Sequence, residues 1–223
     1  MAGVENWESE ECLCTPTPTT PDNTTMKLDI ILSGVGGQGI LSIAAIIAEA
    51  SLRAGLNIKQ AEVHGMSQRG GDVQSHLRIS SEEIFSDLIP RSQADVIIAL
   101  EPMEALRYVP FLSANGWIIS NTAPFKNIVN YPPQEHIINE LASYKNSILL
   151  NVDDLARENG VAKGANMVLL GAASLVLGID YEQLDQSIRN HFSPKGEEVV
   201  RMNLKALELG KDSAVNMAIK EVE

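Results

Sequence analysis

Residues 27–39 have the sequence KLDIILSGVGGQG, and this stretch decides the fold. Its first part, Lys27 to Ser33, is a short apolar run of the kind that forms a buried strand. Glycines follow at the spacing G-x-G-x-x-G, and residues 40–54 then predict a helix that ends at Gly55. A glycine loop that joins a strand to a helix is typical of α/β domains.

Strand and helix patterns alternate along the rest of the chain. Further strands are expected at 57–63, 72–79, 95–100, 116–121 and 147–152, and further helices at 102–112, 135–144, 153–158, 166–177, 182–192 and 196–209. Such alternation favours a sheet of parallel strands covered by helices. The sequence therefore predicts an α/β fold: a three-layer α/β/α sandwich with a mostly parallel, Rossmann-like sheet and a helical C-terminal part.

Two predicted helices are unusually apolar. The helix at 40–54 is interrupted by only four polar residues, so we expect it to pack against a partner chain as well as its own sheet. The apolar stretch at 165–179 is shorter than the ~20 residues that a membrane-spanning helix needs. It predicts a buried helix and no association with a membrane.

The composition limits the number of domains and the kinds of partner. The chain has 223 residues, of which 44% are hydrophobic, and this suits one domain with a substantial core. A formal net charge of −12 argues against a protein that binds nucleic acid. Residues 1–25 are rich in Thr and Pro and contain five acidic but no basic side chains. We expect them to form a disordered leader and residues 26–223 to form the folded domain.

The leader has neither a basic start nor an apolar segment, so it does not resemble a signal peptide and a cytoplasmic protein is expected. It contains both cysteines of the chain, Cys12 and Cys14, which we interpret as incidental thiols, with metal binding or a mixed disulfide as alternatives. The rest of the chain has no cysteine for a disulfide, a thiolate zinc site or an iron–sulfur cluster. Its four histidines lack a metal-binding spacing, so no metal site is predicted.

The first glycine loop consists of Gly34, Gly36, Gly37, Gln38 and Gly39 with the intervening Val35. Its backbone N–H groups and the N-terminus of the following helix are suited to hold an anion. Enzymes that bind dinucleotides also need an acidic residue about 20 positions further on, for the ribose hydroxyls. Glu62 is the nearest match. A free-standing NAD(P) dehydrogenase and a simple tight turn both remain as alternatives.

A second glycine-rich segment follows the strand predicted at 57–63. It places an acid, an imidazole, a hydroxyl, an amide and a guanidinium close together: Glu62, His64, Gly65, Met66, Ser67, Gln68, Arg69, Gly70 and Gly71. The carboxyl end of a parallel strand is where α/β sheets bind ligands. Arg69 is suited to hold a carboxylate or phosphate, and the adjacent glycines let a backbone come close. The alternative is a hydrogen-bonded surface loop without a ligand.

The two loops together resemble a known family. ILSGVGGQGI at 31–40 and EVHGMSQRGG at 62–71, with GANMVLLG at 164–171, are similar to the gamma-type domain of the pyruvate/2-oxoacid:ferredoxin oxidoreductases, and most of all to the small (beta) subunits of the indolepyruvate branch. The resemblance runs from about Lys27 to the last helix. Relatives acting on pyruvate or branched-chain 2-oxoacids usually have a Gly-Pro-Glu type of second loop, so only the combination of loops is specific.

The resemblance implies a reaction, the oxidative decarboxylation of a 2-oxoacid with coenzyme A to an acyl-CoA and reduced ferredoxin. It implies that a large (alpha) partner subunit holds thiamine diphosphate, Mg²⁺ and 4Fe–4S clusters, and that this chain alone holds no cofactor. The chain has no Gly-Asp-Gly and Asn-Asn pattern for a metal–diphosphate site. It is therefore expected to be an accessory catalytic subunit that reaches ferredoxin through the complex, with a homodimer as one form of the isolated chain.

We expect both loops to face the large subunit, near its cofactor, the coenzyme A site or the substrate entrance. Arg69 would bind an anionic group, and His64 would support catalysis by orienting it. Ser67 and Gln68 would add hydrogen bonds, and Asn166, at a helix N-terminus, would complete the site. A purely structural subunit that only completes the fold of the large one is the remaining alternative.

Overall fold

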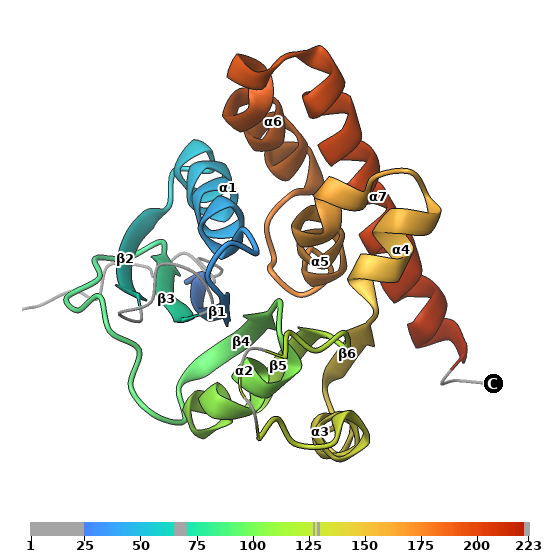
Figure 1. The fold of residues 1–223 in the computed structure, drawn as a ribbon. Coiled ribbons are helices and arrows are strands. Elements are labelled where there is room, and N and C mark those ends of the chain that lie inside the picture. Colours follow the sequence, from blue (N-terminus) through green and yellow to red (C-terminus); the bar gives the residue numbers. More distant parts are fainter. Residues whose placement is uncertain (1–24, 65–70, 127, 129, 221–223) are drawn as a thin grey trace, which may run out of the picture.

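The structure is a computed structural model that describes residues 25–64, 71–126, 128 and 130–220. Six strands form one sheet in the order β2-β3-β1-β4-β5-β6, with helices on both faces (Figure 1). The strands are β1 (Lys27–Val35), β2 (Asn57–His64), β3 (Asp72–Ser80), β4 (Ala94–Ala99), β5 (Leu112–Asn121) and β6 (Ser147–Leu150). The leader predicted at 1–25 lies outside the described residues, except for Thr25.

The helices form a thick layer on one face of the sheet and a thin layer on the other (Figure 1). The thick layer contains α1 (Ile40–Arg53), α4 (Val152–Glu158), α5 (Ala165–Ala173), α6 (Tyr181–Phe192) and α7 (Glu197–Lys220), and the thin layer α2 (Pro102–Tyr108) and α3 (Gln134–Ala142). Three short 3₁₀ helices, η1 (Val109–Phe111), η2 (Ala162–Gly164) and η3 (Ser193–Lys195), join neighbouring elements. The predicted three-layer sandwich with a helical C-terminal part is confirmed.

Five strands run in one direction and β3 runs in the other. β1, β4, β5 and β6 pair in parallel, whereas β3 pairs antiparallel with both β1 and β2. The sheet is therefore mostly parallel, as predicted, but β2 and β3 form a hairpin inserted beside β1. Because β2 still runs in the direction of β1, β2 ends, at His64, on the side of the sheet where the parallel strands have their carboxyl ends.

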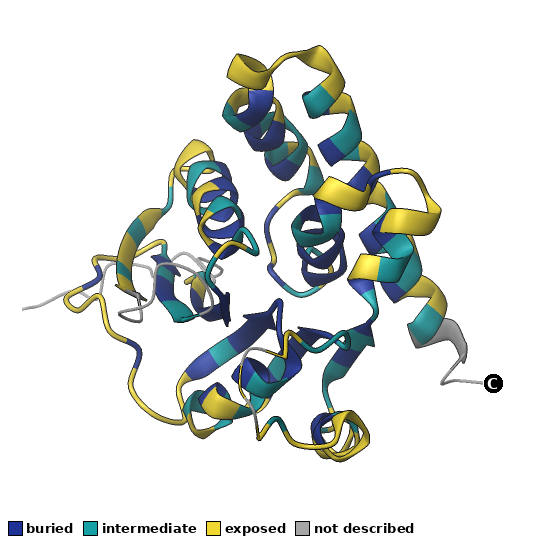
Figure 2. Ribbon diagram, viewed as in Figure 1, coloured by how far each residue is buried: buried dark blue, intermediate teal, exposed yellow. Residues whose placement is uncertain are grey.

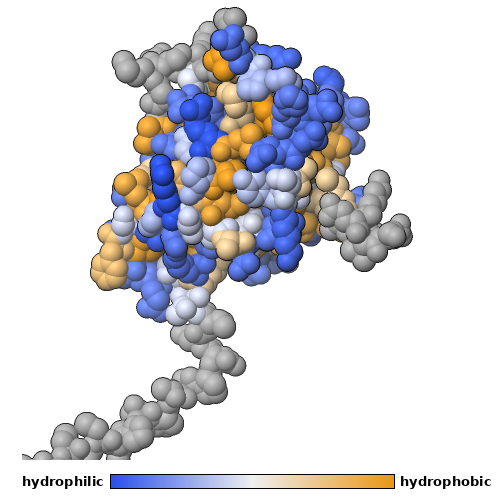
Figure 3. Space-filling view, turned by 90° about the horizontal axis from the view of Figure 1, so that it is seen from below, coloured by the Kyte–Doolittle hydropathy of each residue, from blue (hydrophilic) through white to orange (hydrophobic). Residues whose placement is uncertain are grey.

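The core lies on both sides of β1, β4 and β5. Ile97, Ile98, Ile118 and Ile119 are fully buried, as the continuous apolar run predicted for a central strand requires. Burial decreases toward β2 at the edge of the sheet (Figure 2). On the face of the thin layer, hydrophobic residues remain visible between hydrophilic ones (Figure 3). Two short helices cover that face less completely than the five helices cover the other.

Several predicted helix boundaries were wrong, and the structure gives the reasons. The helix expected at 102–112 ends at Tyr108, because the ring of Pro110 is incompatible with a continuing helix. The helix expected at 166–177 ends at Ala173. The last helix, expected at 196–209, continues through Gly210 to Lys220. Among the described residues, no helix is long and apolar enough to cross a membrane.

Gly210 lies inside α7 because this helix touches α5 backbone to backbone. A Cβ atom on Gly210 would lie 1.8 Å from the carbonyl oxygen of Val168, and one on Gly171 would lie 2.0 Å from that of Leu207. The two glycines face each other's helix, so each removes the side chain that would hold the helices apart. The glycines therefore serve close packing and not a turn.

We predict that Gly210→Ala lowers the free energy of unfolding by about 2–3 kcal/mol, because the added methyl forces the two helices apart. In an isolated helix, replacing Gly by Ala would make the helix more stable by ~1 kcal/mol. A loss of stability in the protein therefore identifies the packing effect. Urea unfolding followed by circular dichroism measures it. Glu208→Ala, at an exposed position of the same helix, is the control and should change stability by less than ~0.5 kcal/mol. A variant as stable as wild type would contradict the packing argument.

His76, on β3, is a buried imidazole held in its neutral form. Its Nδ1 accepts a hydrogen bond from the backbone N–H of Ile89 at 3.0 Å, and its ring meets the ring of Phe111 edge-on at 5.6 Å. Burial lowers the pKa of His76 below its ordinary value of 6.5, outweighing the opposing effect of the Asp87 carboxylate. Between the lowered pKa and 6.5, the unfolded chain therefore binds more protons than the folded one.

The free energy of unfolding should consequently rise with pH through this window and lose its His76 contribution as the pH falls below 6.5. His76→Asn keeps an acceptor for Ile89 but cannot titrate, so its unfolding free energy should depend less on pH. Denaturant unfolding at several pH values between ~5 and ~8 compares the two proteins. His136→Asn, at an exposed position, should retain the wild-type slope. Equal slopes for the two variants would contradict the assignment.

Candidate functional site

The candidate site lies at the carboxyl ends of β1 and β4, where the strand order changes direction. From β1 the chain continues through α1 to the β2–β3 side of the sheet, whereas from β4 it continues through α2 to β5 and β6. α1 lies on the face of the thick layer and α2 on the face of the thin layer (Figure 1). Open α/β sheets bind their ligands in the crevice at such a switch point.

The first glycine loop is a tight turn at this point. The N–H of Gln38 donates to the carbonyl of Val35 at 3.2 Å, which closes a four-residue turn. Gly37 has a φ of +99° and Gly39 a φ of +91°. Positive φ at the third position of such a turn, and again directly before a helix, strains any residue with a side chain. The glycines at these two positions are therefore required by the backbone.

The N-terminus of α1 opens directly from this turn. Gly39 is the N-cap, and no side chain caps the helix. The first N–H groups of a helix have no partner within it, and the helix dipole makes this end positive. With 14 residues, α1 presents a full dipole beside the switch point. The geometry suits a carboxylate or phosphate group of a ligand.

The structure brings the two glycine loops together. The N–H of Gly36 donates to the carbonyl of Gly71 at 2.9 Å, and Val35 lies opposite Asp72 in the β1–β3 ladder. His64 is the last residue of β2, across from Val73. The other predicted residues of the second loop, Gly65, Met66, Ser67, Gln68, Arg69 and Gly70, lie outside the described residues, so their roles stay predictions.

Asn166, from the start of α5, lies against the first loop. Its Nδ2 donates to the carbonyl of Gly39 at 3.3 Å, and its Oδ1 accepts from the N–H of Met167 at 3.0 Å. A Cβ on Gly39 would lie 2.5 Å from this Nδ2, so a side chain there would displace the amide. The structure thus places Asn166 at the entrance to α1, beside the residues with which the sequence groups it.

Glu62 lies away from the first loop. Its carboxylate accepts a hydrogen bond from Nε2 of Gln60 at 2.6 Å, on the exposed edge strand β2. β3 lies between β2 and β1, which separates them by two strand spacings, or about 10 Å. In dinucleotide-binding folds the strand with the acidic residue is the direct neighbour of β1. The position of Glu62 therefore argues against the NAD(P) alternative.

Sequence reasoning missed Glu101, the N-cap of α2 on the other side of the crevice. This carboxylate is 1% exposed, accepts from the N–H of Glu104 at 2.8 Å and also accepts from the hydroxyl of Tyr131. Burial, followed by the hydrogen bond to Glu101, raises the pKa of Tyr131. Pro102 carried part of the signal, since proline favours the first position of a helix, but glutamate is not among the residues that usually cap one.

The α2 side of the crevice is acidic. Burial raises the pKa of Glu104, partly opposed by an ion pair with Arg107 at 2.8 Å. The charge of Asp72 acts on both of these groups, and together with burial it raises the pKa of Tyr108 to about 12. An anionic ligand would therefore be repelled from α2 and attracted to the N-terminus of α1.

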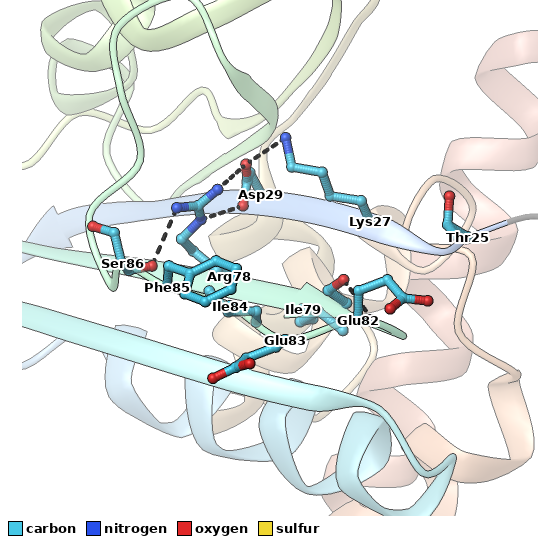
Figure 4. Close-up of a pocket in the computed structure, with 11 residues that line it drawn as sticks. Thr25, Lys27, Asp29, Arg78, Ile79, Glu82, Glu83, Ile84, Phe85 and Ser86 are labelled. Atoms are coloured by element: carbon cyan, nitrogen blue, oxygen red, sulfur yellow. Dashed lines mark hydrogen bonds and ion pairs between the residues drawn. The ribbon is translucent and has the colours of Figure 1, made fainter. Parts of the chain in front are cut away.

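A separate cavity of about 390 Å³ lies at the opposite ends of the strands from the crevice, where β1 begins (Figure 4). The Asp29 carboxylate in it is bound by Arg78 at 2.7 and 3.1 Å and by Lys27 at 3.2 Å. Arg78 also donates to the carbonyls of Ser86 and Leu88. These charged groups already bind one another and brace the segment before β4, so we assign the cavity a structural role.

Comparisons with known proteins agree with this architecture. The family model for pyruvate ferredoxin/flavodoxin oxidoreductase matches residues 29–213. The indolepyruvate oxidoreductase subunit IorB of Archaeoglobus fulgidus is 40% identical over 202 residues, covering 86% of this chain and 97% of the relative. IorB of Thermococcus kodakarensis is 36% identical, covering 86% of this chain and 98% of the relative.

Among solved structures, a 2-oxoglutarate:ferredoxin oxidoreductase from Magnetococcus marinus, with 2-oxoglutarate, coenzyme A and succinyl-CoA bound, superposes with a TM-score of 0.70 at 26% identity. The match covers 85% of this chain and 31% of that longer chain. The fold, the paired glycine loops and the extent of these matches lead to one conclusion. The chain belongs to the pyruvate ferredoxin/flavodoxin oxidoreductase family, among relatives that are subunits of 2-oxoacid oxidoreductases.

Proposed function

We propose that the chain is the accessory catalytic subunit of a 2-oxoacid:ferredoxin oxidoreductase that acts on indolepyruvate or a related aryl-pyruvate. The complex would decarboxylate the 2-oxoacid oxidatively with coenzyme A, yielding an acyl-CoA and reduced ferredoxin. The observation that carries this proposal is the 40% identity with an indolepyruvate oxidoreductase subunit along nearly its whole length.

From Met26 onward, the sequence has no cysteine for an iron–sulfur cluster and no Gly-Asp-Gly and Asn-Asn pattern for a metal–diphosphate site. Among the described residues, no group of three or more His, Cys, Asp or Glu side chains could hold a metal ion. We therefore assign thiamine diphosphate, Mg²⁺ and the 4Fe–4S clusters to a large alpha subunit, through which electrons reach ferredoxin. The hydrophobic residues visible on the α2–α3 face are compatible with burial against a larger partner (Figure 3). We expect this complex in the cytoplasm and a homodimer as one form of the isolated chain.

Within the complex, we assign an anion site to the N-terminus of α1 and the second glycine loop. The ligand groups that suit it are the carboxylate of the 2-oxoacid and the phosphates of coenzyme A. Arg69 would bind the anion through two hydrogen bonds, and His64 would orient it. The hydrogen bond between Gly36 and Gly71 supports a common site, because it places the base of the second loop beside the first.

The first test is co-purification of the chain from its source, followed by a turnover assay. We expect a partner several times larger, brown from its clusters, and reduction of ferredoxin that depends on indolepyruvate and coenzyme A. A colourless assembly of this chain alone that oxidises no 2-oxoacid would contradict the proposal.

In the reconstituted complex, Arg69→Ala should raise KM for coenzyme A or for the 2-oxoacid by roughly tenfold or more, because a charged hydrogen bond to the ligand is lost. Steady-state kinetics with each substrate varied in turn measures this change. Arg91→Ala, which removes an exposed arginine at the far edge of the sheet, is the matched control and should leave both KM values unchanged. Normal assembly with wild-type kinetics for Arg69→Ala would favour the purely structural alternative.

The isolated chain should show no saturable binding of NADH or NADPH, because Glu62 is too far from the first loop to bind a ribose there. Fluorescence titration of the reduced cofactors measures this directly. Binding at micromolar concentrations would favour the free-standing dehydrogenase.

A further inference from the structure

The backbone carbonyl of Leu100, directly after β4, accepts two hydrogen bonds from side-chain amides. Nε2 of Gln38 lies 3.1 Å from this oxygen, and Nδ2 of Asn121 lies 3.2 Å from it. The N–H of Leu100 donates to the carbonyl of Ser33 on β1 at 3.0 Å. One residue therefore connects the ends of β1, β4 and β5 at the crevice.

Gln38 uses both ends of its amide within this arrangement. Its Oε1 accepts from the N–H of Val35 at 2.7 Å, while its Nε2 reaches Leu100. The first bond closes the glycine turn on itself, and the second ties the turn to β4. Because one end must accept and the other must donate, a hydrophobic side chain of equal length cannot replace the amide.

Asn121, the last residue of β5, is 1% exposed and fully hydrogen bonded. Its Oδ1 accepts from the N–H groups of Ala123 at 3.1 Å and Val152 at 3.2 Å. Its Nδ2 donates to Leu100 and, at 2.8 Å, to Oδ2 of Asp153. Two donated and two accepted bonds are an ordinary full complement for an amide, and no other side chain of this size provides them.

We propose that Gln38 and Asn121 are positioning residues. Through the shared carbonyl of Leu100, their amides fix the first glycine loop relative to β4 and β5, and so fix the direction in which the first N–H groups of α1 point. This inference rests on the proposed anion site at that helix end. It assigns Gln38 to the inside of the loop, where the amide holds the loop and does not contact the ligand.

The substitution Gln38→Glu separates this role from simple packing, because glutamate has nearly the same shape. When protonated, its carboxyl group can donate to Leu100 and accept from Val35, as the amide does. When ionised, it still accepts from Val35 but places a negative oxygen against the carbonyl of Leu100. The variant should therefore recover wild-type behaviour at low pH and lose it at high pH, while a packing defect would be present at both.

The experiment has two parts that compare the variant with wild type. In the isolated chain, hydrogen exchange of the amides of Gly36 and Leu100 should be roughly tenfold faster in the variant at pH ~8 and nearly equal at pH ~4, below the ordinary pKa of a glutamate. In the reconstituted complex at pH ~8, KM for coenzyme A or the 2-oxoacid should rise roughly tenfold, with a smaller change in kcat.

Asn121→Asp should show the same pH-dependent pattern, because its carboxylate would face both Leu100 and the carboxylate of Asp153. Gln134→Glu is the matched control: Nε2 of Gln134 also donates to a backbone carbonyl, that of Thr122 at 2.9 Å, but at an exposed position away from the loop. It should match wild type in hydrogen exchange at both pH values and in KM.

Unchanged exchange in Gln38→Glu would overturn the network. Faster exchange with an unchanged KM would overturn the positioning role. A wild-type complex that turns over no 2-oxoacid would overturn the proposed function, and the positioning role with it. The exchange data would still decide whether the amides hold the loop.

Discussion

Between Val35 and Ile40 the chain leaves a buried strand and enters a buried helix, and it has four residues in which to do so. The turn needs positive φ at Gly37 and Gly39, and its direction is held by the amide of Gln38. The position of α1 on the sheet, the approach of Asn166 and the contact with Gly71 all depend on this turn. A turn with bulkier residues, or one without these hydrogen bonds, would misplace these three features at the carboxyl ends of the strands.

The charges around the crevice make its two sides chemically different. On the side of α1, an uncapped helix N-terminus attracts negative charge. On the side of α2, the buried carboxylate of Glu101 already accepts from the N–H of Glu104, and the carboxylate of Glu104 adds a second buried acid. The crevice is thus polarised by the backbone and by a few buried carboxylates. The net negative charge of the chain contributes little to the difference between the two sides, since exposed charges are screened.

Local pattern predicted the elements well, because each strand and helix is determined mainly by its own apolar spacing. The strand at β1, the helix at α1 and the six strands all follow from runs of this kind. The hairpin of β2 and β3 also had a local signal that was not used. The seven residues between them are too few for a parallel crossover, which needs a dozen or more. Their insertion beside β1 depends on distant pairing and could not be inferred locally.

The candidate site was predictable only in part for the same reason. The first loop was found because its glycines are required by the backbone of the loop itself. The roles of Asn121 and Leu100 were missed, because they depend on contacts over 21 and more residues of sequence. The last helix was predicted to end at residue 209, before Gly210, and a glycine that ends a helix looks the same in the sequence as one that lets two helices touch.

The inserted hairpin also has a consequence for the order of folding. β2 and β3 are paired across seven intervening residues, whereas β1 must find β4 across nearly 60 residues of intervening chain. Closing a short loop costs less chain entropy and takes microseconds, so the hairpin can form before the parallel sheet does. β1 would then dock onto the edge of a preformed hairpin.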